Sequence, residues 1–240
     1  METSLPLGDA AATEEILEAL SANGLRLVAQ HWETVAPDLA EHAREYRARL
    51  EWLAAARPLF INSQTGRDWF TAEQNHMIIG IAHEMADRSG VRILHETHRG
   101  KFSYAAGVTA GFLRADPLLR LTADFSHWCT VSESLLEDQG EALSLAIGRT
   151  DHLHARVGHQ EAPQVTDPRA PEWGDALKAH LAWWDRIVDQ HRKAGAATFT
   201  VTPEFGPTPY MPLLPYTRQP VADQWALNLH MMELLKARWD

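Results

Sequence analysis

The sequence contains little cysteine, few basic residues and no long apolar stretch. Cys129 is the only cysteine among 240 residues, which excludes an internal disulfide and a zinc site built from cysteines. No apolar run approaches the roughly 18 residues that a membrane-spanning helix needs. No basic and apolar signal segment opens the chain. We therefore expect a cytoplasmic protein that has no membrane partner.

Acidic residues outnumber basic residues in the sequence. Lys and Arg number 22 against 32 Asp and Glu, which gives a net charge of −10. Such a surface repels a phosphate backbone, so we expect a small-molecule partner and no nucleic acid. The chain is 45% hydrophobic and long enough to bury one large core. We expect a single domain over residues 1–240.

Four stretches share one design, in which a short apolar run ends abruptly in polar residues. The apolar part predicts a strand, and each strand runs into one acid or histidine. Because alternate side chains of a strand share a face, one face of each run is apolar and the other is polar. We expect helices against the apolar face and ligand residues at the polar strand ends. The stretches are VRILHETHR (91–99), LRLTADFSHW (119–128), DHLHARVGH (151–159) and ATFTVTPEFG (197–206), with Glu96, Asp124, His154 and Glu204 as the end residues.

Helical and strand-like patterns alternate along the whole chain, with a period of about thirty residues, which is typical of βα units around a parallel sheet. Helices are expected to begin at Thr13, Asp38 and Thr71, and Gly24 and Gly90 are expected to end the first and third. The Pro-rich stretch 158–173 follows the His154 strand and is expected to cover the substrate or to form a plain surface loop.

About seven strands can be counted, and the first is a stub within residues 1–9. A closed (β/α)₈ barrel has eight. The barrel is then incomplete, or a first unit was lost through the choice of start site, or a partner chain closes the gap. An open seam exposes strand edges, so we expect a homo-oligomer, either a dimer or a tetramer.

The four strand ends resemble those of the xylose isomerase-like TIM barrels, a family that includes sugar-phosphate isomerases and epimerases, ketose 3-epimerases, inosose dehydratases and the endonuclease IV group. The motifs HLHARVGHQEAPQV and ADFSHW carry the resemblance, together with the order Glu, Asp, His, Glu. It extends over nearly the whole chain from Thr13. It implies an α/β fold, a (β/α) TIM barrel that lacks its first βα unit and has about seven strands. It also implies one divalent metal ion bound by Glu96, Asp124, His154 and Glu204.

Three carboxylates and one imidazole suit Mn²⁺ or Mg²⁺ and are compatible with Zn²⁺, Co²⁺ or Fe²⁺. Glu96 and Glu204 are the expected catalytic pair, as the resemblance also implies. One removes a proton beside a substrate carbonyl, and the other returns it to the enediolate that the metal holds. We therefore expect an enzyme, a divalent-metal-dependent sugar or sugar-phosphate isomerase or epimerase that acts on a sugar or polyol.

The substrate-binding candidates are His127, Arg156, His98 and His31. His127 follows Asp124 by three residues, where the ketose epimerases have a His beside the substrate. Gln160 departs from the Arg that those epimerases carry six residues after the metal His. A lyase similar to the inosose dehydratases therefore remains an alternative, as does a non-catalytic sugar-binding protein with an incomplete barrel. The acidic charge disfavours a nuclease of the endonuclease IV type.

Overall fold

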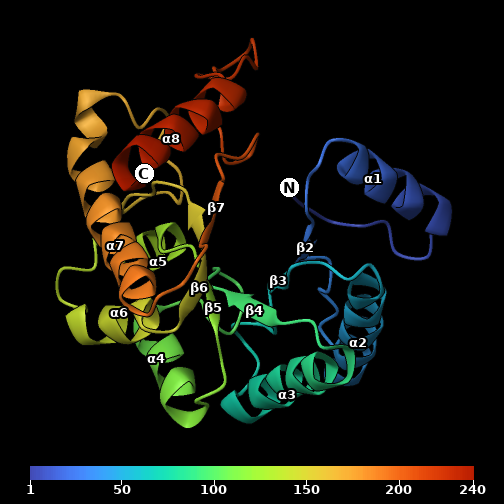
Figure 1. Ribbon diagram of the computed structural model, residues 1–240. Coiled ribbons are helices and arrows are strands. Elements are labelled where there is room, and N and C mark those ends of the chain that lie inside the picture. The colour runs from blue at the N-terminus through green and yellow to red at the C-terminus, as the bar shows by residue number, and fades with distance from the viewer. The chain divides into compact units, whose positions relative to one another are not determined.

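The computed structural model describes residues 1–240, and it confirms the predicted alternation of strands and helices (Figure 1). Seven strands form a parallel sheet in the order β1-β2-β3-β4-β5-β6-β7. No helix combines the length and the apolar composition needed to cross a membrane. The strands are β1 (Glu2–Thr3), β2 (Val28–His31), β3 (Ile61–Ser63), β4 (Ile93–Glu96), β5 (Leu121–Ala123), β6 (Thr150–Ala155) and β7 (Thr200–Pro203). The helices are α1 (Ala10–Ala22), α2 (Leu39–Ala55), α3 (Ala72–Ser89), α4 (Ala106–Ala115), α5 (Ser126–Ser132), α6 (Gly140–Ile147), η1 (Pro171–Trp173), α7 (Gly174–Lys193) and α8 (Gln224–Trp239).

The chain forms two compact units, and the expectation of a single domain stays a prediction. Unit 1 comprises Met1–Glu96, Gly100–Ser103 and Leu118–Arg120. Its helices α2 and α3 lie side by side (Figure 1). Buried apolar side chains of β2, β3 and β4 pack with those of α1, α2 and α3, as alternation along the strands predicts. They include Ala29, Ile61, Ile93, Leu20, Tyr46, Leu50, Leu53, Ile78 and Met85.

Local signals explain where the helices of unit 1 begin and end. Thr71 and the side chain of Gln74 form a capping box at the start of α3, and Gly90 ends that helix in the left-handed region at φ 70°. α2 begins where a helix was expected, at Leu39, and the carboxylate of Asp38 caps it by accepting the backbone N–H of Glu41. The prediction of Thr13 as the first cap was wrong. Asp9 takes this role because its carboxylate accepts the backbone N–H of Ala12, which lets the helix begin at Ala10.

Unit 2 comprises Thr97–Arg99, Tyr104–Pro117 and Leu121–Asp240, and it contains β5, β6 and β7. β5 occupies the apolar part of the stretch 119–128, and α5 begins within the polar part of that stretch, at Ser126. β7 ends the strand order and is half-buried along its whole length. Asp124 directly follows β5, before α5, and Glu204 directly follows β7, before the loop that leads to α8.

Candidate metal centre

Asp124 follows β5 and is completely buried. Its Oδ1 accepts the backbone N–H of Ser126 at 3.2 Å and also the hydroxyl of that residue. Its own backbone N–H donates to Oγ1 of Thr97 at 2.7 Å. Burial raises the pKa of Asp124, whereas the neighbouring Arg156 lowers it. The first residue of α5 therefore fixes this carboxylate in one orientation.

His154 and Glu204 come from neighbouring strand ends. Nδ1 of His154 lies 2.7 Å from Oε2 of Glu204. His154 is buried, and the Glu204 side chain is 24% exposed to solvent. The ligand atoms of Asp124, His154 and Glu204 all lie within 4.8 Å of one another. Two carboxylate oxygens and one imidazole nitrogen at this spacing fit a small divalent cation.

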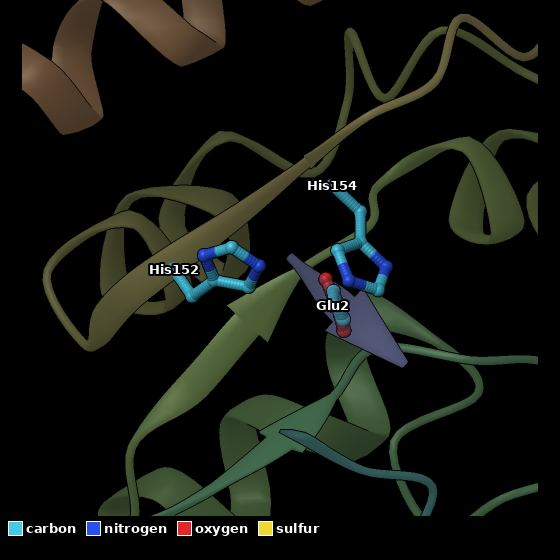
Figure 2. Close-up of side chains that lie close together, drawn as sticks. All are labelled: Glu2, His152 and His154. Atoms are coloured by element: carbon cyan, nitrogen blue, oxygen red, sulfur yellow. The ribbon is translucent and has the colours of Figure 1, made fainter. Parts of the chain in front are cut away.

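His152 precedes His154 by two residues and points to the same side of β6; Figure 2 draws both rings, whose centroids lie 5.3 Å apart. Nδ1 of His152 lies 2.9 Å from the carbonyl and 2.8 Å from the hydroxyl of Thr200, and Nε2 lies 3.3 Å from Oγ1 of Thr202. These contacts join β6 to β7 along the registered pairs. His152 therefore helps to bring the carboxyl end of β7, and Glu204 with it, to His154.

The guanidinium of Arg156 is buried against the same carboxylates. It donates to Asp124, to Nε2 of His127 at 2.7 Å and to Oγ of Ser126 at 3.3 Å. One of its nitrogens also lies 3.8 Å from Oε2 of Glu204. Its donors are thus directed at protein groups, and the substrate-binding role predicted for Arg156 stays a prediction.

His127 is buried beneath a small aromatic cluster. Burial lowers the pKa of His127 well below its ordinary value, and the nearby His98 and Arg156 lower it further. The ring is therefore neutral, with Nε2 accepting from Arg156 and the proton on Nδ1. The His98 ring lies 3.9 Å from that of His127, and its Nε2 lies 3.3 Å from the hydroxyl of Tyr210.

Tyr210 is a contact residue that the sequence reasoning missed. It lies in the loop after β7, and the Arg156 guanidinium sits 4.5 Å from the centre of its ring. Burial raises the pKa of Tyr210, so its hydroxyl stays protonated near neutral pH. An aromatic residue six positions after Glu204, in EFGPTPY, was the available signal. The ring covers Arg156 and lies beside His127.

Glu96 and His31 belong to unit 1, at the ends of β4 and β2. The buried Glu96 carboxylate accepts the side-chain amides of Asn62 at 3.0 Å and Gln64 at 3.3 Å, partners that the sequence reasoning missed. His31 uses one ring nitrogen on Ser63 at 3.0 Å and the other on Thr34 at 2.8 Å. Burial lowers the pKa of His31 well below its ordinary value. Its predicted contact with substrate stays a prediction.

Comparison with known proteins gives structural likeness only, since no family model and no curated protein matches the chain. The D-allulose 3-epimerase from Methylomonas sp. is 17% identical, with a TM-score of 0.60 over 99% of this chain and 86% of its own. The probable 3-DHS dehydratase from Bacillus anthracis is 16% identical, with a TM-score of 0.55 over 95% and 83%. A xylose isomerase-like TIM barrel protein from Mycobacterium smegmatis, solved in complex with magnesium, is 9% identical, with a TM-score of 0.59 over 97% and 80%.

All three structures resemble this chain in architecture. Each likeness spans more than nine-tenths of this chain. The seven parallel strands, each followed by at least one helix, are the arrangement expected from the sequence. The chain therefore has the fold of the xylose isomerase-like TIM barrels.

Proposed function

We propose that the protein is a divalent-metal-dependent sugar isomerase or epimerase. The observation that carries the proposal is the convergence of Asp124, His154 and Glu204, with ligand atoms within 4.8 Å of one another at the ends of consecutive strands. The likeness to a D-allulose 3-epimerase and to a magnesium complex of the same fold supports it. We take Glu96 as the fourth ligand from its place at the end of the preceding strand, next in the chain to Thr97, which binds the backbone of Asp124.

The donor set indicates Mg²⁺ or Mn²⁺, with Zn²⁺, Co²⁺ and Fe²⁺ as alternatives. When bound, such an ion polarises a substrate carbonyl and makes the adjacent C–H more acidic. Glu204 has the partial exposure that a group exchanging protons with substrate needs. Glu96 is fully buried and is held by two amides. We propose that one glutamate removes the proton beside the carbonyl and the other returns it.

The remaining side chains would position substrate. Tyr210 and His98 reach the half-buried surface above His127 and can donate to or accept from sugar hydroxyls. Arg156 neutralises Asp124 and holds His127 in the neutral form. A lyase is the second candidate function, supported by the likeness to a probable 3-DHS dehydratase. The same carboxylates can act as acid and base in the elimination of water from a substrate.

Metal binding to the purified protein tests the proposal. Titration calorimetry with Mn²⁺ is expected to give one site per chain, and Asp124→Asn or His154→Gln is expected to weaken it at least 100-fold. Asp151→Asn on the same strand is the matched control, because Asp151 lies outside the ligand set. No Mn²⁺, Mg²⁺ or Zn²⁺ binding by the folded wild type would refute the proposal and favour a metal-free binding protein.

Activity distinguishes the two reactions. Ketoses, aldoses and inososes incubated in deuterated water are expected to exchange a C–H proton for a deuteron. After transfer back to ordinary water, the product is expected to be an isomer that is one mass unit heavier than the substrate. Loss of 18 mass units from the substrate would assign the lyase instead. Glu204→Gln is expected to lower turnover by ~10²–10⁴-fold in either case.

A further inference from the structure

The backbone directly after Glu204 is held by two side-chain amides. The N–H of Phe205 donates to Oδ1 of Asn228 at 2.8 Å, and Nδ2 of Asn228 donates to the Phe205 carbonyl at 3.0 Å. The N–H of Gly206 donates to Oε1 of Gln164 at 2.7 Å, and Nε2 of Gln164 donates to the Gly206 carbonyl at 3.2 Å. Each amide therefore pairs with both backbone groups of one residue, as a neighbouring strand would.

The two amides come from separate segments of unit 2. Gln164 is buried in the loop after β6, and Asn228 lies in α8. Phe205 is also buried, whereas Gly206 and Asn228 are partly buried, so water can replace these hydrogen bonds only in part. The loop 158–173, expected from the sequence to cover substrate, thus makes a defined contact with the turn after Glu204.

The position of β7 explains why such support is needed. β7 is the last strand in the sheet order and pairs with β6 alone. An edge strand lacks ladder hydrogen bonds on one side, and its end is the part most prone to fray. Glu204 follows that end directly, with its carboxylate 2.7 Å from His154. A displacement of the turn would move this carboxylate.

We propose that Gln164 and Asn228 are positioning residues that hold the Glu204 carboxylate beside His154 through the backbone of Phe205 and Gly206. Neither side chain belongs to the ligand set. The inference rests on the proposed function for its catalytic consequence. Groups that orient metal ligands typically contribute about 10- to 100-fold to metal affinity. We expect a loss of this size in Gln164→Met and in Asn228→Leu.

Titration calorimetry with Mn²⁺ tests this coupling through a double-mutant cycle. Gln164→Met is expected to weaken binding at least 10-fold in the wild type and in Asp124→Asn, but to have no further effect in Glu204→Gln, where the positioned group is already lost. Gln190→Met is the matched control, because its side-chain amide also bonds a backbone carbonyl, that of Ile147 at 3.2 Å. Equal losses in all three backgrounds, or an equal loss in Gln190→Met, would overturn the proposal.

A second readout does not depend on metal. The ¹⁵N chemical shifts of the His154 ring depend on the position of the nearby Glu204 carboxylate. Hydrogen exchange measures how well the backbone N–H groups of Phe205 and Gly206 are protected by their hydrogen bonds. Gln164→Met is expected to shift the His154 ring signals and to remove protection at Gly206. Unchanged His154 signals would refute the positioning role, whether or not the wild type binds metal. A wild type that binds no metal would refute the proposed function, and the two failures are therefore distinguishable.

Discussion

Lys101 carries a buried positive charge that lowers the stability of unit 1. Its side chain is 4% exposed, and Nζ makes no hydrogen bond. Burial lowers the pKa of Lys101 from 10.5 to about 8, and the neighbouring Arg67 adds to this effect, while Glu96, Glu33 and Asp68 oppose it. The nearest acids are already engaged, Glu33 with Arg49 and Glu96 with Asn62. Replacing Lys101 by methionine removes the charge and keeps an apolar stem of similar length.

The pKa change sets the size of the effect. Each pKa unit corresponds to about 1.4 kcal/mol, so holding the ammonium inside the fold costs about 3 kcal/mol at pH 7. Between about pH 8 and pH 10.5 the unfolded chain keeps the proton that the folded chain has lost, so stability rises with pH in that window. Lys101→Met should therefore be more stable than wild type by about 3 kcal/mol at pH 7 and by only about 1 kcal/mol at pH 10.

Urea unfolding of wild type and Lys101→Met at pH 7 and pH 10, followed by circular dichroism, measures this difference. Taking the difference between the two proteins cancels the titration of every other group. Lys178→Met, which changes an exposed lysine of α7, is the matched control and should leave stability within about 0.5 kcal/mol at both pH values. A stability difference that does not change with pH would refute the assignment of a buried, charged amine to Lys101.

Two further predictions concern the surroundings of Asp124. A Cβ at Gly158 would lie 2.7 Å from Cβ and 2.8 Å from the carbonyl of Ser126. Gly158→Ala should therefore displace Ser126, lower the unfolding free energy by ~1–3 kcal/mol and weaken Mn²⁺ binding, whereas Gly107→Ala in the exposed part of α4 should do neither. Cys129 is fully buried, and burial raises the pKa of its thiol. Ellman's reagent should leave the native protein unmodified and react with one thiol in urea; rapid stoichiometric labelling of the native state would contradict this burial.

Local chemistry accounts for what could be predicted from the sequence. The capping box at Thr71 and the left-handed Gly90 act within one turn of the helix they bound, so the sequence neighbourhood determines them. The strand ends were found because alternation and an abrupt change in polarity are also local. The start of α5 was missed because its N-cap, Phe125, has no side-chain capping bond; the N–H and hydroxyl of the first helical residue, Ser126, bond to Asp124, which the sequence assigned to metal binding alone.

Contacts between distant segments were not predictable in this way. Asn62 reaches Glu96 across 34 residues, and Gln164 reaches Gly206 across 42. A lone amide in a strand or a Pro-rich loop gives no sequence signal of its partner. Tyr210 likewise meets Arg156 only because the loop after β7 folds back over the strand ends of unit 2. Such partners depend on how loops and strands far apart in the chain meet in the fold, which the periodicity within one segment does not specify.

The period of two along β6 connects these observations. His152, His154 and Arg156 alternate with apolar residues and point to one face. His152 binds the backbone of β7, His154 contacts Glu204 after β7, and Arg156 binds Asp124 after β5. β6 lies between β5 and β7 in the strand order, so side chains from one strand can reach both neighbours. A shift of β6 by one residue would turn all three side chains to the other face. The same register that forms the sheet therefore assembles the candidate ligands.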